Sequence, residues 1–282
     1  KKELLKIKEA FKLSVNPINQ ILAIKSGKDR IYLYEYPSFK KKKRIKLNGI
    51  VDFEFNLPES NIWVFKSEDS KQSMILFDEK GKIIKSVDIN DFANFNNFLK
   101  VRDSDIALFW NTATKKGSSE QDLNIYSVDL STGKIISTYE GIQSTISEVE
   151  FYERENLVIA ASNDGTIKVW PLEMDNSQNT GYPASIIPLA DQELVTIMKN
   201  GVYDATREAF QQMHYVQGRE YVSLDQLKSQ YYEPYILSKL FRFNNEEIRA
   251  SGALEEIQLY PEIELQHPNI NGGNLGIDLK ER

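Results

Sequence analysis

Short apolar segments recur along the first 170 residues at nearly regular spacing. They are ILAI at 21–24, IWVF at 62–65, IALF at 106–109 and LVIA at 157–160. Their starts lie 41, 44 and 51 residues apart. Each segment is too short for a helix and is rich in β-branched and aromatic residues, which predicts β-strands.

Two further series of apolar segments follow the first. One occupies 31–34, 74–77, 124–127 and 167–170, and a weaker one occupies 44–47, 82–85 and 134–137. Polar turn residues separate the segments, such as those at 26–29, 79–81 and 131–133. About four strands in every ~40–45 residues is the period of a propeller blade, which buries both faces against its neighbours.

The pattern changes after residue 175. A polar loop over 175–183 is followed by two expected strands at 185–188 and 194–198. Helices are then expected over 224–231 and 234–241, followed by a third short one that Asn244 or Asn245 caps. Beyond them, apolar residues alternate with polar ones around Ile263 and Leu265 and again from Leu275 to Leu279, which predicts two strands.

These patterns predict a mostly β chain. β-Propeller blades, four to five of them, are expected over 1–205, a short helical connector over 206–257 and the start of a truncated, β-sandwich-like domain over 258–282. Because four or five blades are fewer than the common seven, we expect a partial or open ring: either N-terminal blades lie outside this chain, or the ring itself is small or open. The exposed sheet faces of such an array require cover from another segment or another chain.

Composition narrows the function classes. No apolar run exceeds five residues, so no membrane-spanning helix is expected. The chain has no cysteine, which excludes a cysteine nucleophile and thiolate metal sites within it and favours a reducing, cytoplasmic compartment. A net charge of −6 and a pI of about 5.3 disfavour nucleic-acid binding. Because the first residue is Lys1, we expect the chain to be part of a longer polypeptide.

Residues 140–172 resemble one WD40 repeat. Apolar residues alternate along 146–151, a second strand covers 157–162, and an Asn-Asp-Gly-Thr turn at 163–166 precedes a strand that ends in Trp170. The resemblance implies a structural blade network of Ser162, Asp164 and Trp170. That network is incomplete here, because Ile142 stands where the family has His and Pro171 where it has Asp.

A second resemblance covers about 140–282. The connector motif Gly201, Tyr203 and Asp204, with the segments 214–218 and 221–240, is similar to bacterial multidomain WD40 proteins. In that family a propeller precedes a small β domain and a caspase-like peptidase. The resemblance implies a peptidase in the remaining domains of the same polypeptide, and it assigns no catalytic residue to this chain.

Other candidate chemistry is sparse. His214 and His267 are isolated, so we expect structural roles for them and no metal site or cofactor. The pair Asp103 and Asp105 lacks the glycine and glutamate of a calcium loop. The basic run at 40–44 is expected in a solvated hairpin. Exposed aromatic side chains, namely Tyr36, Phe39, Trp110 and Tyr182, are candidates for an interaction surface.

The sequence therefore favours a non-catalytic module that binds a protein or peptide partner and regulates an attached caspase-like peptidase. Neither nucleic acid nor a membrane is an expected partner. The alternative is a hydrolase or lyase whose site lies in the propeller channel. A third interpretation is a structural subunit of a larger assembly.

Overall fold

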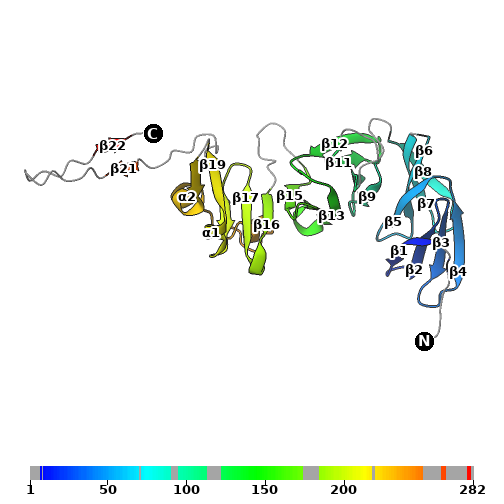
Figure 1. Cartoon of the computed structure of the whole chain (residues 1–282). Coiled ribbons are helices and arrows are strands. Elements are labelled where there is room, and N and C mark those ends of the chain that lie inside the picture. The colour runs from blue at the N-terminus through cyan, green and yellow to red at the C-terminus, as the bar shows by residue number, and fades with distance from the viewer. Residues whose placement is uncertain are drawn as a thin grey trace, which may run out of the picture. The chain divides into compact units, whose positions relative to one another are not determined.

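The chain forms two compact units, Lys1–Pro183 and Ala184–Arg282 (Figure 1). The computed structural model describes residues 7, 9–69, 71–89, 95–112, 122–173, 184–217 and 220–249, together with the backbone of two short strands near the C-terminus. The expected boundary at 205 therefore differs from the division in the structure, which falls before residue 184.

The described part of the first unit contains three four-stranded antiparallel sheets, each made of strands that follow one another in the chain. We call these sheets blades. Blade 1 contains β1 (Ala10–Asn16), β2 (Ile21–Ser26), β3 (Arg30–Glu35) and β4 (Lys41–Lys46). Blade 2 contains β5 (Ile50–Phe55), β6 (Ile62–Glu68), β7 (Lys71–Phe77) and β8 (Ile83–Asp88). Blade 3 contains β9 (Asn97–Lys100), β10 (Ile106–Trp110), β11 (Ile125–Asp129) and β12 (Lys134–Tyr139).

A fourth blade begins within the same unit. It contains β13 (Ile146–Tyr152), the 3₁₀ turn η1 (Glu153–Glu155), β14 (Leu157–Ser162) and β15 (Ile167–Pro171), with β14 paired to both other strands. All four segments of the first apolar series lie in the second strand of a blade. The central strands are thus confirmed where the sequence predicts them.

The blades pack face to face in chain order. Blades 1 and 2 share an apolar core that includes Ile31 and Phe53. Blades 2 and 3 share a second core around Phe65 and Phe109, and blades 3 and 4 share a third that includes Trp170. The central strands β6 and β10 each contribute to two of these cores through alternate side chains, which explains their nearly continuous apolar sequences.

The first strand of each blade forms a common inner row. Contacts join β1 to β5, β5 to β9, and β9 to β13. No strand pairing between the described residues joins the first and last blades of this unit, so the blades form an open array. The chain is therefore mostly β, and its first unit has the architecture of successive propeller-like blades that the sequence predicts.

The second unit combines strands and short helices. It contains β16 (Ala184–Pro188), η2 (Ala190–Gln192), β17 (Leu194–Met198), β18 (Tyr203–Ala205), α1 (Ala209–Gln212), β19 (His214–Gln217), β20 (Glu220–Ser223), α2 (Leu224–Tyr231) and α3 (Ile236–Leu240). The short strands β21 (Glu262–Glu264) and β22 (Asp278–Lys280) pair antiparallel. The expected β-sandwich-like domain otherwise lies outside the described residues.

One core explains why β17 and β18 belong to the second unit. Val195 and Tyr203 pack with Val222, Leu227 and Tyr231, so these strands share their apolar surface with α2. The helix α2 has the bounds that the sequence predicts. Ser223 is the N-cap residue of this helix. It forms a capping box with Gln226, in which the Ser223 N–H donates to Gln226 Oε1 at 3.0 Å.

Two local expectations are wrong. No helix forms at 244–247, where the Glu246 N–H instead donates to Asn244 Oδ1 at 3.0 Å in a short turn. The basic run at 40–44 is not a hairpin turn but continues into β4, the outermost strand of blade 1. Lysine at an exposed sheet edge discourages pairing with another chain, which gives these charges a structural reason.

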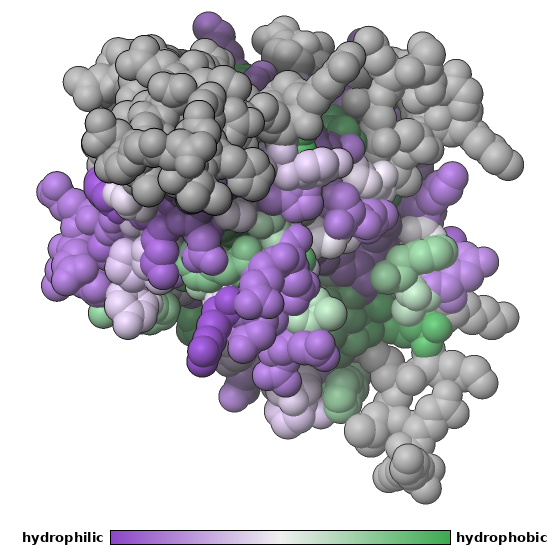
Figure 2. Space-filling model, turned by 60° about the vertical axis from the view of Figure 1, so that its left-hand side comes forward, coloured by the Kyte–Doolittle hydropathy of each residue, from purple (hydrophilic) through white to green (hydrophobic). Residues whose placement is uncertain are grey.

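The surface is mixed in polarity. Hydrophilic side chains dominate the face seen in Figure 2, with smaller hydrophobic patches between them. Among the described residues, no helix is long and apolar enough to cross a membrane.

Candidate functional site: the inner-strand channel

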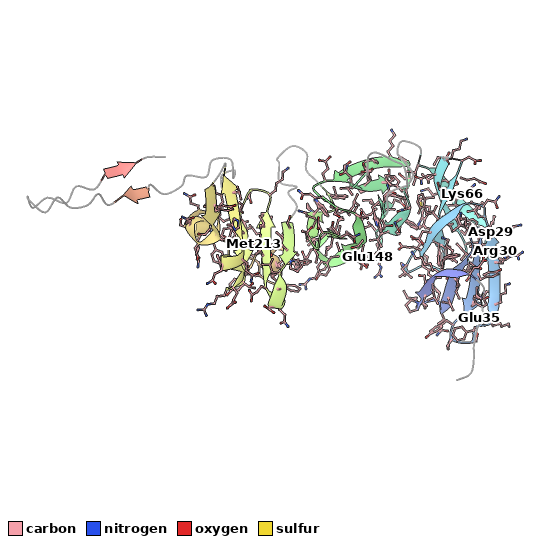
Figure 3. The ribbon with its side chains drawn as sticks, in the orientation of Figure 1. Asp29, Arg30, Glu35, Lys66, Glu148 and Met213 are labelled. Carbon is pink, nitrogen blue, oxygen red and sulfur yellow. The ribbon has the colours of Figure 1, made fainter. Side chains whose placement is uncertain are left out.

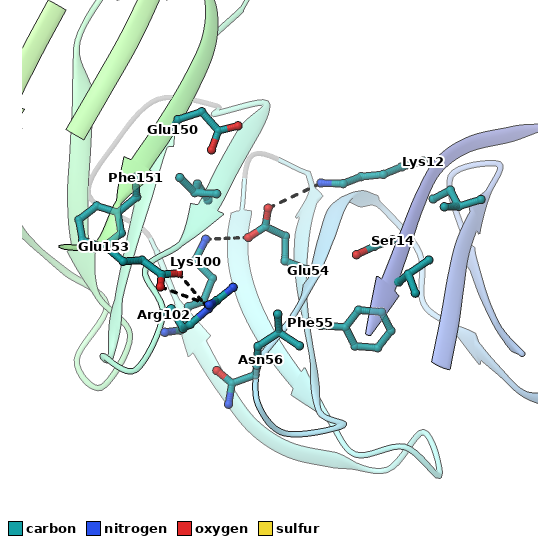
Figure 4. Close-up of a pocket in the computed structure, with 14 residues that line it drawn as sticks. Lys12, Ser14, Glu54, Phe55, Asn56, Lys100, Arg102, Glu150, Phe151 and Glu153 are labelled. Carbon is teal, nitrogen blue, oxygen red and sulfur yellow. Dashed lines mark hydrogen bonds and ion pairs between the residues drawn. The ribbon is translucent and has the colours of Figure 1, made fainter. Parts of the chain in front are cut away.

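A cavity of about 300 Å³ lies where the inner strands of the four blades meet (Figure 4). Its walls come from β1, β5, β9 and β13 and from the residues that follow them. The charged side chains that line it are Lys12, Glu54, Lys100, Arg102, Glu150 and Glu153. A second cavity of about 440 Å³ shares Lys12, Glu54 and Glu150 with the first and adds Asp52 and Glu148. We call the two cavities together the inner-strand channel.

Ion pairs fix part of the channel wall. Lys12 Nζ lies 2.8 Å from Asp52 Oδ2 and 3.9 Å from Glu54 Oε1, which links blades 1 and 2. Arg102 Nε lies 2.9 Å from Glu153 Oε1, which links blades 3 and 4. Both pairs join residues from neighbouring blades, so they position the inner strands relative to one another.

Glu54 is the most perturbed carboxyl group of the channel. Its Oε2 accepts the backbone N–H of Lys100 at 2.7 Å. Burial raises the pKa of Glu54 to about 7, because loss of water disfavours the charged form more than this hydrogen bond and Lys12 favour it. The neighbouring carboxylates of Asp52 and Glu150 raise the pKa further. Glu54 therefore changes charge near neutral pH.

The negative charge of the channel is only partly compensated. The Nζ of Lys25 donates to the carbonyl of Val51, and that of Lys100 donates to the carbonyls of Val101 and Ser104, so neither pairs with a carboxylate. Glu148 and Glu150 project from β13 and form no ion pair with any side chain that the structure describes. Figure 3 marks the position of Glu148 on this strand. The channel thus offers carboxylates to a cationic group.

Asp164 and Trp170 of the expected blade network have different hydrogen-bond partners in the structure. Asp164 Oδ1 accepts the N–H of Thr166 at 2.8 Å and its hydroxyl at 2.7 Å. These bonds hold the pKa of Asp164 below its usual range. The Trp170 indole instead donates to the carbonyl of Glu140 at 3.3 Å. With no histidine at position 142, the tryptophan is anchored to backbone, and Ser162 lies buried in β14.

The connector motif forms hydrogen bonds to two other segments of the second unit. The Tyr203 hydroxyl donates to the carbonyl of Leu224, and Asp204 Oδ2 accepts the N–H of Tyr235 at 2.8 Å. Gly201 has φ +86° in the turn before β18, a conformation that favours glycine. These contacts tie β18 to the starts of α2 and α3, so the motif stabilises the connector.

The candidate aromatic surface is only partly present. Tyr36 is 43% exposed and contacts Phe39 edge-on at 5.9 Å. Trp110 is only 4% exposed, so its expected place on an exposed surface is wrong: β10 is a central strand, and Trp110 packs into the core between blades 3 and 4. Tyr182 lies outside the described residues.

Of the two histidines, the structure describes only His214, and it belongs to no group of metal-ligating side chains among the described residues. His214 contacts the ring of Tyr221 at 4.9 Å across the β19–β20 ribbon. His267 lies outside the described residues. No group of three or more potential metal ligands occurs among the residues that the structure describes.

The channel residues escaped the sequence analysis because inner strands carry little apolar signal. In β1 and β5, charged or polar residues such as Lys12, Ser14, Asp52 and Glu54 alternate with apolar ones. A usable signal was present: a short alternating segment precedes each apolar central strand. Read as the first strand of each blade, these segments place their polar residues on one inner wall.

Comparisons with known proteins give a limited match. No protein-family model matches the chain, and neither does any curated protein. Among solved structures, the chain is similar to the crystal structure of the WD40 beta propeller domain of Doa1, with 16% sequence identity and a TM-score of 0.41. The match covers 63% of this chain and 57% of that one, which is less than two thirds of its length.

Proposed function

We propose that the blades form a non-catalytic scaffold that binds a protein or peptide partner through the inner-strand channel. In the full-length polypeptide, this binding regulates an attached caspase-like peptidase. The observation that carries the proposal is the convergence of four inner strands on one cavity lined by charged side chains. Side chains held on paired strands need little ordering when a partner binds, which favours recognition.

The charge balance of the channel indicates the chemistry of the partner. Lys12 and Arg102 are engaged by Asp52 and Glu153, whereas Glu148 and Glu150 have no described cation beside them. A lysine or arginine side chain of a partner would lie near Glu54 and Glu150 and reduce their mutual repulsion. We therefore assign an extended segment with a basic side chain to the channel.

Binding of such a segment tests the proposal. Peptides selected from a random display library against the 282-residue chain are expected to be enriched in Lys or Arg at one position. In a fluorescence-anisotropy titration, the Glu54→Gln, Glu150→Gln double variant is expected to weaken binding of the selected peptide by roughly 10- to 100-fold, because two charge-assisted contacts are lost.

Glu208→Gln provides the matched control. Glu208 is exposed in the second unit, so its substitution removes one charge without touching the channel. It is expected to leave the affinity unchanged. Equal loss of affinity in both variants, or selected peptides without basic residues, would contradict the assignment of the channel.

A pH dependence of stability follows from Glu54. Its pKa of about 7 in the folded state lies above the ordinary value of 4.5, so the folded chain binds more protons than the unfolded one between these values. The contribution of Glu54 to the free energy of unfolding therefore falls as pH rises from about 4.5 to 7 and is constant above. The upper bound of this loss is roughly 3 kcal/mol.

Urea unfolding of the wild type and Glu54→Gln at pH 5 and pH 8 measures this effect. The variant is expected to be more stable than the wild type at pH 8 and to lose that advantage at pH 5. The Gln side chain keeps an oxygen that accepts the Lys100 N–H. An advantage of the same size at both pH values would show that Glu54 does not titrate in this window.

Regulation of the peptidase has a separate test. Peptidase turnover of the full-length polypeptide is expected to change when the selected peptide is added, and Glu54→Gln, Glu150→Gln is expected to abolish that response. A full-length polypeptide without a cysteine–histidine peptidase domain would refute the regulatory part of the proposal and leave peptide binding intact.

A further inference from the structure

Blade 1 has one face that packs on blade 2 and one face without a neighbouring blade in the described structure. Its second face, which we call the blade-1 outer face, includes Leu13, Val15, Leu22, Ile24, Tyr32 and Tyr34. Leu22, Ile24 and Tyr34 are buried, but Leu13 is 60% exposed. Leu13 thus leaves a large apolar side chain open to solvent on an apolar sheet face, which indicates a contact surface.

The corresponding positions of blade 2 show what such a face does. Leu13 pairs with Ile24 across β1 and β2, as Phe53 pairs with Val64 across β5 and β6. Phe53 and Val64 lie on the face of blade 2 that packs against blade 1, and both are fully buried. Leu13 therefore occupies the position that in blade 2 is covered by the preceding blade.

The charges of this face indicate what it contacts. Tyr32 pairs with Arg44 across β3 and β4, so the two side chains share the face. Arg30 is adjacent and is held by Asp29 at 2.8 Å; Figure 3 marks both residues at the start of β3. Lys41 Nζ lies 4.6 Å from the centre of the Tyr32 ring. The outer part of the face is thus basic, while its inner part is apolar.

Two of the contacts between the described blades also combine an apolar core with charged side chains. The contact between blades 1 and 2 has an apolar core and the pairs Lys12–Asp52 and Lys42–Glu79, the latter at 3.7 Å. The contact between blades 3 and 4 has an apolar core and the pair Arg102–Glu153. In each of these pairs, the cation comes from the earlier blade or the residues that follow its inner strand.

We propose that the blade-1 outer face binds a further four-stranded blade of the same polypeptide, encoded before Lys1. That blade packs apolar side chains on Leu13 and places carboxylates opposite Arg44 and Lys41. The contact continues the stack that joins blades 1 to 4. This proposal does not depend on peptide binding by the channel.

Thiol labelling tests it directly, because the chain contains no cysteine. Leu13→Cys is introduced into the 282-residue chain and into the polypeptide extended by the sequence that its gene encodes before Lys1. A maleimide is expected to label the shorter chain rapidly and the extended one at least about 10-fold more slowly, since the site must open locally to react.

Ile136→Cys is the matched control. Ile136 is 49% exposed on β12, away from this face, and is expected to be labelled at the same rate in both chains. A second variant, Arg44→Glu, is expected to lower the melting temperature of the extended chain by about 3 °C or more and to leave the shorter chain unchanged. Equal labelling of Leu13→Cys in both chains, or a gene that encodes no β-blade before Lys1, would overturn the proposal.

Discussion

Replacing Phe109 by alanine is expected to destabilise the first unit by about 3–5 kcal/mol. Phe109 is fully buried in the core between blades 2 and 3. Its ring lies 5.3 Å from that of Phe65, 5.5 Å from Phe95 and 6.0 Å from Phe98. The substitution removes the ring on which the other three pack and leaves a cavity that β-sheets on both sides cannot close.

Equilibrium unfolding in urea, followed by far-UV circular dichroism, measures this loss. Ile136→Ala is the control, because Ile136 is half exposed and its truncation is expected to cost less than about 1 kcal/mol. A loss for Phe109→Ala no larger than that of the control would show that blades 2 and 3 do not share this core.

Trp170→Ala is expected to have a comparable effect, about 3–5 kcal/mol, at the next contact between blades. Trp170 is 1% exposed and packs edge-on against Tyr139 of blade 3, with ring centres 5.9 Å apart. Trp170→Phe keeps most of this packing and removes the indole N–H that donates to Glu140. It is expected to cost about 1–2 kcal/mol, the scale of one hydrogen bond with some lost volume.

The stability lost in Trp170→Phe, compared with that lost in Trp170→Ala, shows whether Trp170 stabilises the blades mainly by packing or by its hydrogen bond. Both variants are measured by urea unfolding followed by the signal of the remaining tryptophans, Trp63 and Trp110. If Trp170→Phe were as damaging as Trp170→Ala, the indole hydrogen bond would dominate over packing. The structure predicts the opposite, because the acceptor is a single backbone carbonyl.

The sequence predicts the central strands of the blades better than any other part of the fold. Strands such as β6 and β10 are buried on both faces, and their apolar runs are visible without knowledge of their neighbours. The helix α2 is equally well predicted, because Ser223 and its spacing to the apolar residues that follow are local signals. The expected short helix at 244–247 fails because Asn244 satisfies the local backbone in a turn.

The candidate site is less accessible to sequence analysis. Lys12, Glu54 and Glu150 lie on three separate strands and Arg102 follows a fourth, and only the stacking of blades brings them together. Trp110 illustrates the converse error. An aromatic residue at the end of an apolar run resembles a surface contact, yet the blade packed on β10 buries it.

A bound partner is expected to contact the inner strands of successive blades, and photo-crosslinking tests this most directly. The selected peptide is synthesised with a benzophenone next to its basic residue, and the crosslinked residues of the 282-residue chain are identified by mass spectrometry. We expect crosslinks in β1, β5, β9 or β13 and the residues that follow them, and their loss in Glu54→Gln, Glu150→Gln. Crosslinks confined to the outer strands β4, β8 and β12 or to the second unit would contradict the account.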